Sequence, residues 1–147
     1  MMHHAQTLRN TPLSTRGNVS FFGDLGYELD LKHLLPTEEK EIASQIAFYK
    51  RYRSIFQFGA LHRIKADYAY CWQVSGGNTH LAGLFHRLQH AAPGYEQLRV
   101  LGLDKEKLYR VTSLEQVSQR TFTSLPTRST VNDVPPQGCF FFIFTIS

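Results

Sequence analysis

The pattern of apolar and polar positions predicts one long helix in the first half of the chain. Between about Glu38 and Gln57, apolar side chains recur at helical spacing and form a broad stripe. Thr37 is the expected N-cap, and Gly59 is the expected stop. The stripe consists of Ile42, Ile46, Tyr49 and Phe56, flanked by Phe48, Tyr52 and Ile55. A stripe of this width predicts packing against a large surface such as a sheet.

The segment before this helix carries shorter signals. Thr11 and Pro12 predict the start of a short helix that fits before Gly17, with Thr11 as its cap. The apolar run 19–22 then predicts a short strand or the entry to one.

Apolar and acidic side chains alternate over residues 27–31. A period of two places Tyr27, Leu29 and Leu31 on one face and Glu28 and Asp30 on the other. This pattern is typical of a half-buried strand.

The second half has the two-residue period of strands. Residues 68–74 and 81–88 predict a hairpin around a turn at 76–78, and residues 97–101 and 108–111 predict two further strands. We therefore expect antiparallel β structure arranged as a sandwich or part of one.

The end of the chain follows neither period. Residues 113–137 are rich in Ser, Thr, Pro and Gln, which indicates mostly loop or disordered chain. The run from Cys139 to Ile146 is strongly apolar and is prone to aggregate unless a partner surface covers it.

Composition favours a folded, cytosolic protein. Hydrophobic residues make up 42% of the 147 residues, which is enough for a core, and the net charge of +4 is spread without a basic run or nucleic-acid motif. No apolar stretch reaches the roughly 20 residues that span a bilayer, and no signal peptide is evident. Cys71 and Cys139 lack metal or redox spacing, so we expect reduced thiols, no metal site and no cofactor. We expect neither a nucleic-acid nor a membrane partner.

Three stretches together resemble a known family. They run from residue 11 to residue 31, from 45 to 63 and from 98 to 111. The first stretch contains Thr-Pro-Leu-Ser-Thr-Arg-Gly-Asn-Val and Leu-Gly-Tyr-Glu-Leu-Asp-Leu. The second contains Gln-Ile-Ala-Phe-Tyr-Lys and Gln-Phe-Gly. The third contains Leu-Arg-Val, Gly-Leu-Asp and Leu-Tyr-Arg-Val. In this order and spacing, the chain is similar to the C-terminal portion of glycoside hydrolase family 36 alpha-galactosidases. The similarity covers roughly residues 7–112.

The resemblance implies an α+β fold. Residues 1–65 would form the end of a catalytic (β/α)8 barrel, with the eighth strand at Phe21 to Leu31 and the long helix covering it. Residues 66–118 would begin a C-terminal antiparallel β-sandwich domain, and residues 119–147 would be a divergent or disordered tail. The family removes terminal alpha-linked galactose from sugars such as melibiose and raffinose.

The resemblance also implies that this chain is catalytically silent. Retaining hydrolysis uses two carboxyl groups about 5–5.5 Å apart. The family places them in a Lys-Trp-Asp motif and an Arg-x-Asp segment, and neither occurs here, since Trp72 precedes Gln73. No residue of this chain inherits a catalytic role, so we expect it to depend on the missing barrel portion or to self-associate.

Glu28 and Asp30 are the candidate substrate-binding residues, because active sites of such barrels lie at the carboxyl ends of the strands. The alternative is that they cap or bridge loops. Arg16 has the same two interpretations, structural or ligand-binding, and the aromatic stripe from Tyr68 to Trp72 indicates either core or a sugar platform. A non-catalytic β-sandwich module that binds carbohydrate or protein is the alternative function, and a degraded gene product is a third.

Overall fold

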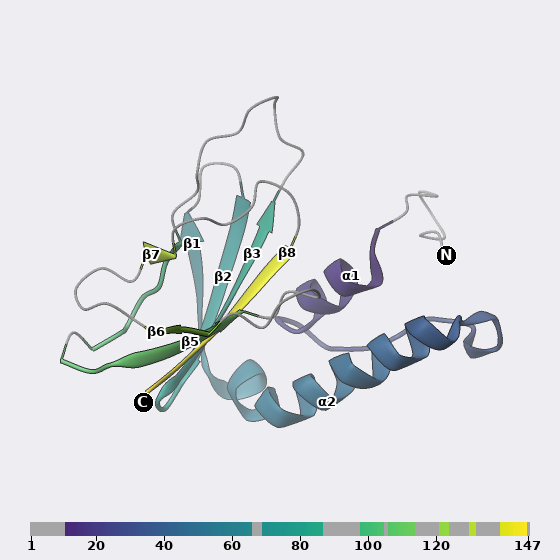
Figure 1. Ribbon diagram of the computed structural model, residues 1–147, viewed down its shortest axis with the longest axis horizontal. Helices are drawn as coiled ribbons and strands as arrows, with labels where there is room; N and C mark the ends of the chain where they lie inside the picture. Colours follow the sequence, from purple (N-terminus) through teal and green to yellow (C-terminus); the bar gives the residue numbers. More distant parts are fainter. Residues whose placement is uncertain are drawn as a thin grey trace.

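Two helices pack against one face of an antiparallel sheet (Figure 1). The computed structural model describes residues 11–65, 69–86, 98–104, 106–113, 121–123, 130–131 and 139–146. Helix α1 spans Leu13–Ser20, a 3-10 turn η1 spans Leu31–His33, and helix α2 spans Pro36–Phe58. The predicted mixture of helix and antiparallel strand is confirmed.

Within the described residues, the main sheet has six strands in the order β1-β2-β3-β8-β5-β6, and the pairings among them are antiparallel. A separate pair joins β4 to β7. The strands are β1 (Ala60–Lys65), β2 (Ala69–Gly76), β3 (Thr79–His86), β4 (Leu98–Arg99), β5 (Tyr109–Ser113), β6 (Thr121–Thr123), β7 (Thr130–Val131) and β8 (Cys139–Ile146).

The hairpin β2–β3 is where the alternation predicted it. Its turn contains Gly77, whose φ of +56° suits glycine, followed by Asn78. The strands predicted at 97–101 and 108–111 are also present as β4 and β5. Strand β1, which we predicted with the helical part, instead pairs along its full length with β2 at the edge of the sheet.

The apolar C-terminal strand β8 lies in the middle of the sheet, between β3 and β5. The expectation of a disordered tail therefore does not hold for Cys139–Ile146. The physical reason is that both faces of β8 are covered. Phe141 and Ile143 belong to the core beneath the helices, whereas Phe142 and Phe144 belong to the core on the opposite face. A strand buried on both faces has a continuous apolar run and no alternation.

Helix α1 replaces the strand that we predicted at residues 19–22. It runs through Gly17 to Ser20, and Pro12 rather than Thr11 is its N-cap residue. The Ser20 hydroxyl donates to the carbonyl of Arg16 at 2.8 Å. Phe21 then leaves the helix and is 2% exposed. The apolar character of this run therefore reflects packing of Phe21 into the core, and not pairing with another strand.

Helix α2 covers the predicted range and extends it at both ends. Its N-cap is Leu35, not Thr37, because Pro36 occupies the first helical position. The side chain of Glu38 reaches back and accepts from the Leu35 N–H at 3.0 Å. Gly59 ends the helix as predicted.

Residues 27–31 do not form a strand in the structure. The segment is extended, without ladder hydrogen bonds, and passes into η1 at Leu31. The predicted alternation holds in part, because Tyr27 and Leu29 are half-buried while Glu28 and Asp30 are exposed. It fails at Leu31, which lies in η1 and is 69% exposed. The two-residue period in the sequence therefore comes from an extended segment that lies against the helices, and not from a paired β-strand.

Phe141 joins the helices to the sheet. Its ring lies 5.4–6.0 Å from four aromatic rings of the helical part, those of Phe21, Phe22, Phe48 and Phe56. Opposite it in β3 is Gly83, where an added Cβ would come within 2.8 Å of the Phe22 ring. Glycine therefore lets Phe22 approach the sheet closely.

We expect Phe141→Ala to lower the free energy of unfolding by about 3–5 kcal/mol, because it opens a cavity at a fully buried site. The matched control is Phe58→Ala, since Phe58 is 85% exposed and its truncation is expected to change stability by about 0.5 kcal/mol or less. Urea unfolding followed by tyrosine and tryptophan fluorescence measures both. Equal losses in the two variants would contradict the packing described above.

Candidate functional site

The two predicted substrate-binding residues lie on the extended segment between α1 and η1. The side chain of Glu28 is exposed, and no hydrogen bond of its carboxylate is found within the described ranges. Asp30 is exposed as well and directly precedes η1. The structure thus brings both residues to one exposed segment, two positions apart.

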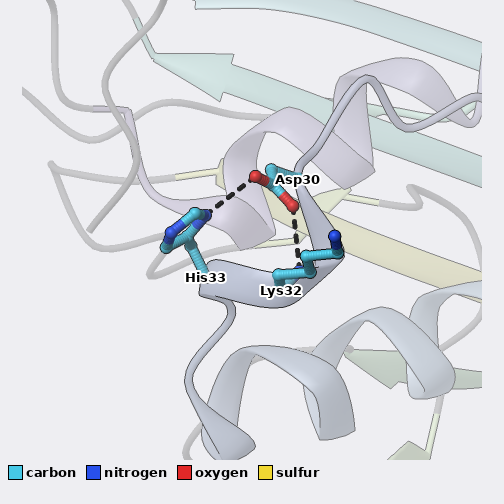
Figure 2. Close-up of polar contacts among 3 residues, drawn as sticks. All are labelled: Asp30, Lys32 and His33. Atoms are coloured by element: carbon cyan, nitrogen blue, oxygen red, sulfur yellow. Dashed lines mark hydrogen bonds and ion pairs between the residues drawn. The ribbon is translucent and has the colours of Figure 1, made fainter.

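The carboxylate of Asp30 is engaged with the turn that follows it (Figure 2). Oδ1 accepts from the Lys32 N–H at 3.0 Å, and Oδ2 lies 2.8 Å from Nδ1 of His33. These bonds make Asp30 the cap of η1, which supports the capping alternative for this residue. Both side chains remain open to water, at 56% for Asp30 and 78% for His33, so the ion pair contributes little to stability.

Gln45 is a buried polar contact that sequence reasoning missed. Its Oε1 accepts from the Tyr27 hydroxyl at 2.6 Å, and its Nε2 donates to the Leu13 carbonyl at 3.3 Å and to Glu41 at 3.3 Å. One amide therefore ties the extended segment and α1 to α2. The signal was present, because Gln45 occupies the apolar stripe three residues after Ile42.

Burial and proximity both act on Tyr27. Its removal from water raises the pKa of the Tyr27 phenol, and the nearby carboxylate of Glu41 raises that pKa further. The phenol is therefore a hydrogen-bond donor at neutral pH and holds the segment in place without any charge of its own.

The aromatic stripe on β2 is mostly core. The Trp72 ring lies 5.8 Å from Phe22 and 5.1 Å from Phe85, and it is half-buried beneath the helices. Tyr70 is 55% exposed, and Tyr68 lies outside the described residues. The core interpretation therefore holds for Trp72, and Tyr70 is the more exposed of the two described aromatics.

A second polar cluster lies on the opposite face of the sheet. Gln73 is fully buried and forms two bonds with the backbone of Leu101, donating to its carbonyl at 2.7 Å and accepting from its N–H at 2.8 Å. Gln73 Nε2 also donates to the Ser75 hydroxyl at 2.9 Å, and that hydroxyl lies 2.9 Å from Nδ1 of His80. The amide thus fixes the chain at Leu101 against the sheet.

Burial acts on the imidazole of His80. The Ser75 hydroxyl and Nδ1 of His80 share one hydrogen bond, and which of them donates depends on the tautomer of the imidazole. Burial lowers the pKa of His80, because it disfavours the charged imidazolium. The buried position and the absence of an acidic partner in the described part of the cluster favour a structural role over a Ser–His catalytic one.

Neither a metal cluster nor a membrane span is found where the structure describes the chain. No group of three His, Cys, Asp or Glu residues converges there, and no described helix is long and apolar enough to cross a bilayer. Cys71 is 1% exposed, so its thiol lies inside the core. Residues 1–10, which include the neighbouring His3 and His4, and the side chain of Cys139 lie outside the described residues.

Comparison with known proteins adds the decisive observation. The sequence profile of the melibiase family matches residues 2–59. Alpha-galactosidase Mel36A of Lactobacillus acidophilus is 35% identical over 116 residues, which are 76% of this chain and 16% of the relative. The chain belongs to glycoside hydrolase family 36.

Solved structures of this family have the same fold. A variant of alpha-galactosidase AgaA from Geobacillus stearothermophilus, in complex with raffinose, superposes with a TM-score of 0.82 at 25% identity. It covers 98% of this chain, which corresponds to 21% of that protein. The alpha-galactosidase of Lactobacillus brevis gives a TM-score of 0.77 at 30% identity over the same share of the chain. This family 36 chain thus spans about one fifth of the length of these structures and 16% of Mel36A.

The buried histidine of this family 36 chain predicts a pH dependence. An unfolded histidine titrates near pH 6.5, whereas folded His80 has a lower pKa. Between the two values the unfolded chain binds more protons, so the free energy of unfolding falls as the pH decreases below about 6.5, by at most about 1.4 kcal/mol per pH unit. We expect His80→Gln to remove this part of the slope between pH 7.5 and pH 5, as measured by urea unfolding at each pH.

The control is His62→Gln, because His62 is exposed on β1. We expect that variant to keep the slope of the parent chain. A slope unchanged by His80→Gln would contradict the assignment of a buried neutral imidazole.

Proposed function

We propose that this chain supplies the closing part of an alpha-galactosidase that removes terminal alpha-linked galactose from oligosaccharides such as raffinose. In this proposal, α1, the extended segment and α2 complete a (β/α)8 barrel, and the sheet from β1 to β8 is a C-terminal β domain. The observation that carries it is the agreement in fold over 98% of the chain with a family 36 enzyme that was crystallised with raffinose.

The division of the chain supports this assignment. The melibiase profile ends at residue 59, which is where α2 ends and the sheet begins. We keep the predicted division into 1–65, 66–118 and 119–147 as a proposal, with one change. Strands β1 and β8 pair within the sheet, so we count them with the sheet domain.

The chain contributes structure to the reaction and not the reacting carboxylates. Neither acidic motif of the family is in the sequence, and the exposed acids Glu28 and Asp30 lie on a segment that Gln45 and Tyr27 hold in place. We propose that Glu28 and Asp30 line the edge of the sugar pocket in the complete enzyme. Asp30 has the weaker case, since His33 and Lys32 already engage its carboxylate.

Exposed apolar side chains at separate places on the chain also enter the proposal. Leu31, Phe58 and Leu108 expose 69%, 85% and 62% of their areas. Apolar side chains this open favour contact with the rest of the enzyme, or self-association when the chain is alone. The alternative of a carbohydrate-binding module has less support, because Trp72 is packed against Phe22 and Phe85. The cytosolic location expected from the sequence stays a prediction.

Two activity measurements test the proposal. We expect the purified 147-residue chain to release no galactose from an aryl alpha-galactoside, because two adjacent carboxylates are required. We expect a hybrid, in which this chain replaces the matching fifth of AgaA, to fold and release galactose. AgaA truncated at the same junction is the control and is expected to be inactive.

Turnover by the isolated chain, purified free of host galactosidase, would contradict the assignment of its role. A hybrid that folds and binds raffinose but has no activity would contradict the claim that the chain can complete the enzyme.

A further inference from the structure

Glu28 lies between two anchored residues of the extended segment. On one side, the Tyr27 hydroxyl donates to Oε1 of Gln45 at 2.6 Å. On the other side, the carboxylate of Asp30 caps η1. The side chain of Glu28 itself is exposed, and no hydrogen bond of its carboxylate is found among the described residues. The segment therefore has fixed flanks around one acid that faces solvent.

The hydrogen bonds of Gln45 determine which way its amide points. Its Nε2 donates to the Leu13 carbonyl and to the Glu41 carboxylate, each at 3.3 Å. Because these two oxygens only accept, the NH2 group must lie on their side, and Oε1 must face Tyr27. The phenol is therefore the donor, and the contact has a direction that an apolar pair in the same place would lack.

The amide also fits a space that α1 leaves open for it. A Cβ at Gly17 would collide with the Gln45 side chain, so glycine at this position lets the amide lie against the helix. Gln45 is 8% exposed and lies in the apolar stripe of α2, three residues after the buried Ile42. A buried amide is unfavourable unless its hydrogen bonds are made, whereas a satisfied network makes one arrangement of the chain rigid.

A fixed Tyr27 side chain sets the direction of Glu28. Neighbouring side chains of an extended segment point to opposite sides, and the burial of residues 27–30 alternates accordingly. Tyr27 points toward α2, so Glu28 points away from it. Carboxylate oxygens accept hydrogen bonds from hydroxyl groups, which are the groups that a galactoside presents.

We propose that Tyr27 and Gln45 are positioning residues for Glu28, and that Glu28 accepts a hydrogen bond from a sugar hydroxyl in the complete enzyme. The inference rests on the proposed function, in which Glu28 lines the edge of the sugar pocket. It adds that affinity for the galactoside depends on the Tyr27 hydroxyl, which bonds the scaffold and not the sugar. All three residues fall within the melibiase match at residues 2–59.

The hybrid with AgaA tests the proposal through substrate affinity. Tyr27→Phe removes only the hydroxyl, and we expect it to raise the KM for raffinose about 2- to 10-fold, the effect of one hydrogen bond, with kcat little changed. We expect Glu28→Ala to raise KM at least as much. In the Glu28→Ala background, Tyr27→Phe is expected to have no further effect on KM, because both changes act on the same contact.

The matched control is Tyr109→Phe. The Tyr109 hydroxyl accepts from the Asp104 N–H at 3.0 Å, and its ring belongs to the core on the sheet face away from the helices. The control makes the same chemical change at another buried hydrogen bond. We expect it to leave KM unchanged, even where it lowers the Tm of the hybrid as much as Tyr27→Phe does.

The isolated chain gives a second readout that does not need the hybrid. The backbone order parameter from 15N NMR relaxation is about 0.85 in rigid chain and below about 0.6 in flexible chain. We expect Tyr27→Phe to lower the order parameter of the Glu28 amide toward the flexible value, and Tyr109→Phe to leave it unchanged. An order parameter that Tyr27→Phe does not change would overturn the positioning role.

The outcomes separate the two proposals. An inactive hybrid argues against the proposed function, and the NMR measurement still decides whether Tyr27 positions Glu28. An active hybrid whose KM is unchanged by Tyr27→Phe or by Glu28→Ala overturns the inference and leaves the role of the chain in completing the enzyme standing. Equal effects of Tyr27→Phe with and without Glu28→Ala also overturn it, because the hydroxyl would then act by a route other than Glu28.

Discussion

The packing of Phe141 under the aromatic rings of the helical part is the contact on which the rest of this structure depends. Phe141 comes from the last strand of the chain, and the rings above it come from residues 21–56, so one contact joins the two ends of the sequence. Strand β8 carries this ring into the centre of the sheet, where its neighbours Phe142 and Phe144 fill the opposite core. The helices and the sheet therefore cannot be packed independently.

This packing bears on how a chain without catalytic carboxylates would contribute to the proposed enzyme. Residues of α1 and of the extended segment are held by α2, through Gln45, and α2 is held by the sheet. Glu28 and the surface of α1 are therefore held in place through these contacts with α2. If the chain acts as proposed, the same contacts would position its helical part with respect to acids that come from elsewhere in the enzyme.

Much of this architecture could be predicted from the sequence, wherever a period was long and unambiguous. The stripe from Ile42 to Phe56 identified α2, and the alternation in 69–86 with Gly77 at the turn identified the hairpin. Short apolar runs were not decisive, because residues 19–22 complete a helix and enter a core, and residues 27–31 alternate without a ladder. The continuous run of β8 has no period, so its central place depends on coverage of both faces, which only the tertiary structure shows.

The polar sites were harder to predict for a related reason. Gln45 and Gln73 each interrupt an apolar pattern, but the sequence does not show that one bonds Tyr27 and the other bonds the backbone of Leu101, 28 residues away. The side chain of Arg16 was equally hard to predict, because packing buries its Nε, which has no hydrogen-bond partner among the described residues. Glu28 and Asp30 are exposed on an extended segment and not on the strand that the sequence predicted, and their role in sugar binding stays a prediction.

Native-state hydrogen exchange of the isolated chain tests most directly whether helices and sheet fold as one unit. If they do, the slowest amides of α2 and of β8 open with the same free energy, equal to that of global unfolding. If α2 instead exchanges through an opening that costs much less than the opening of β8, the helical part folds separately and the central place given to Phe141 is wrong.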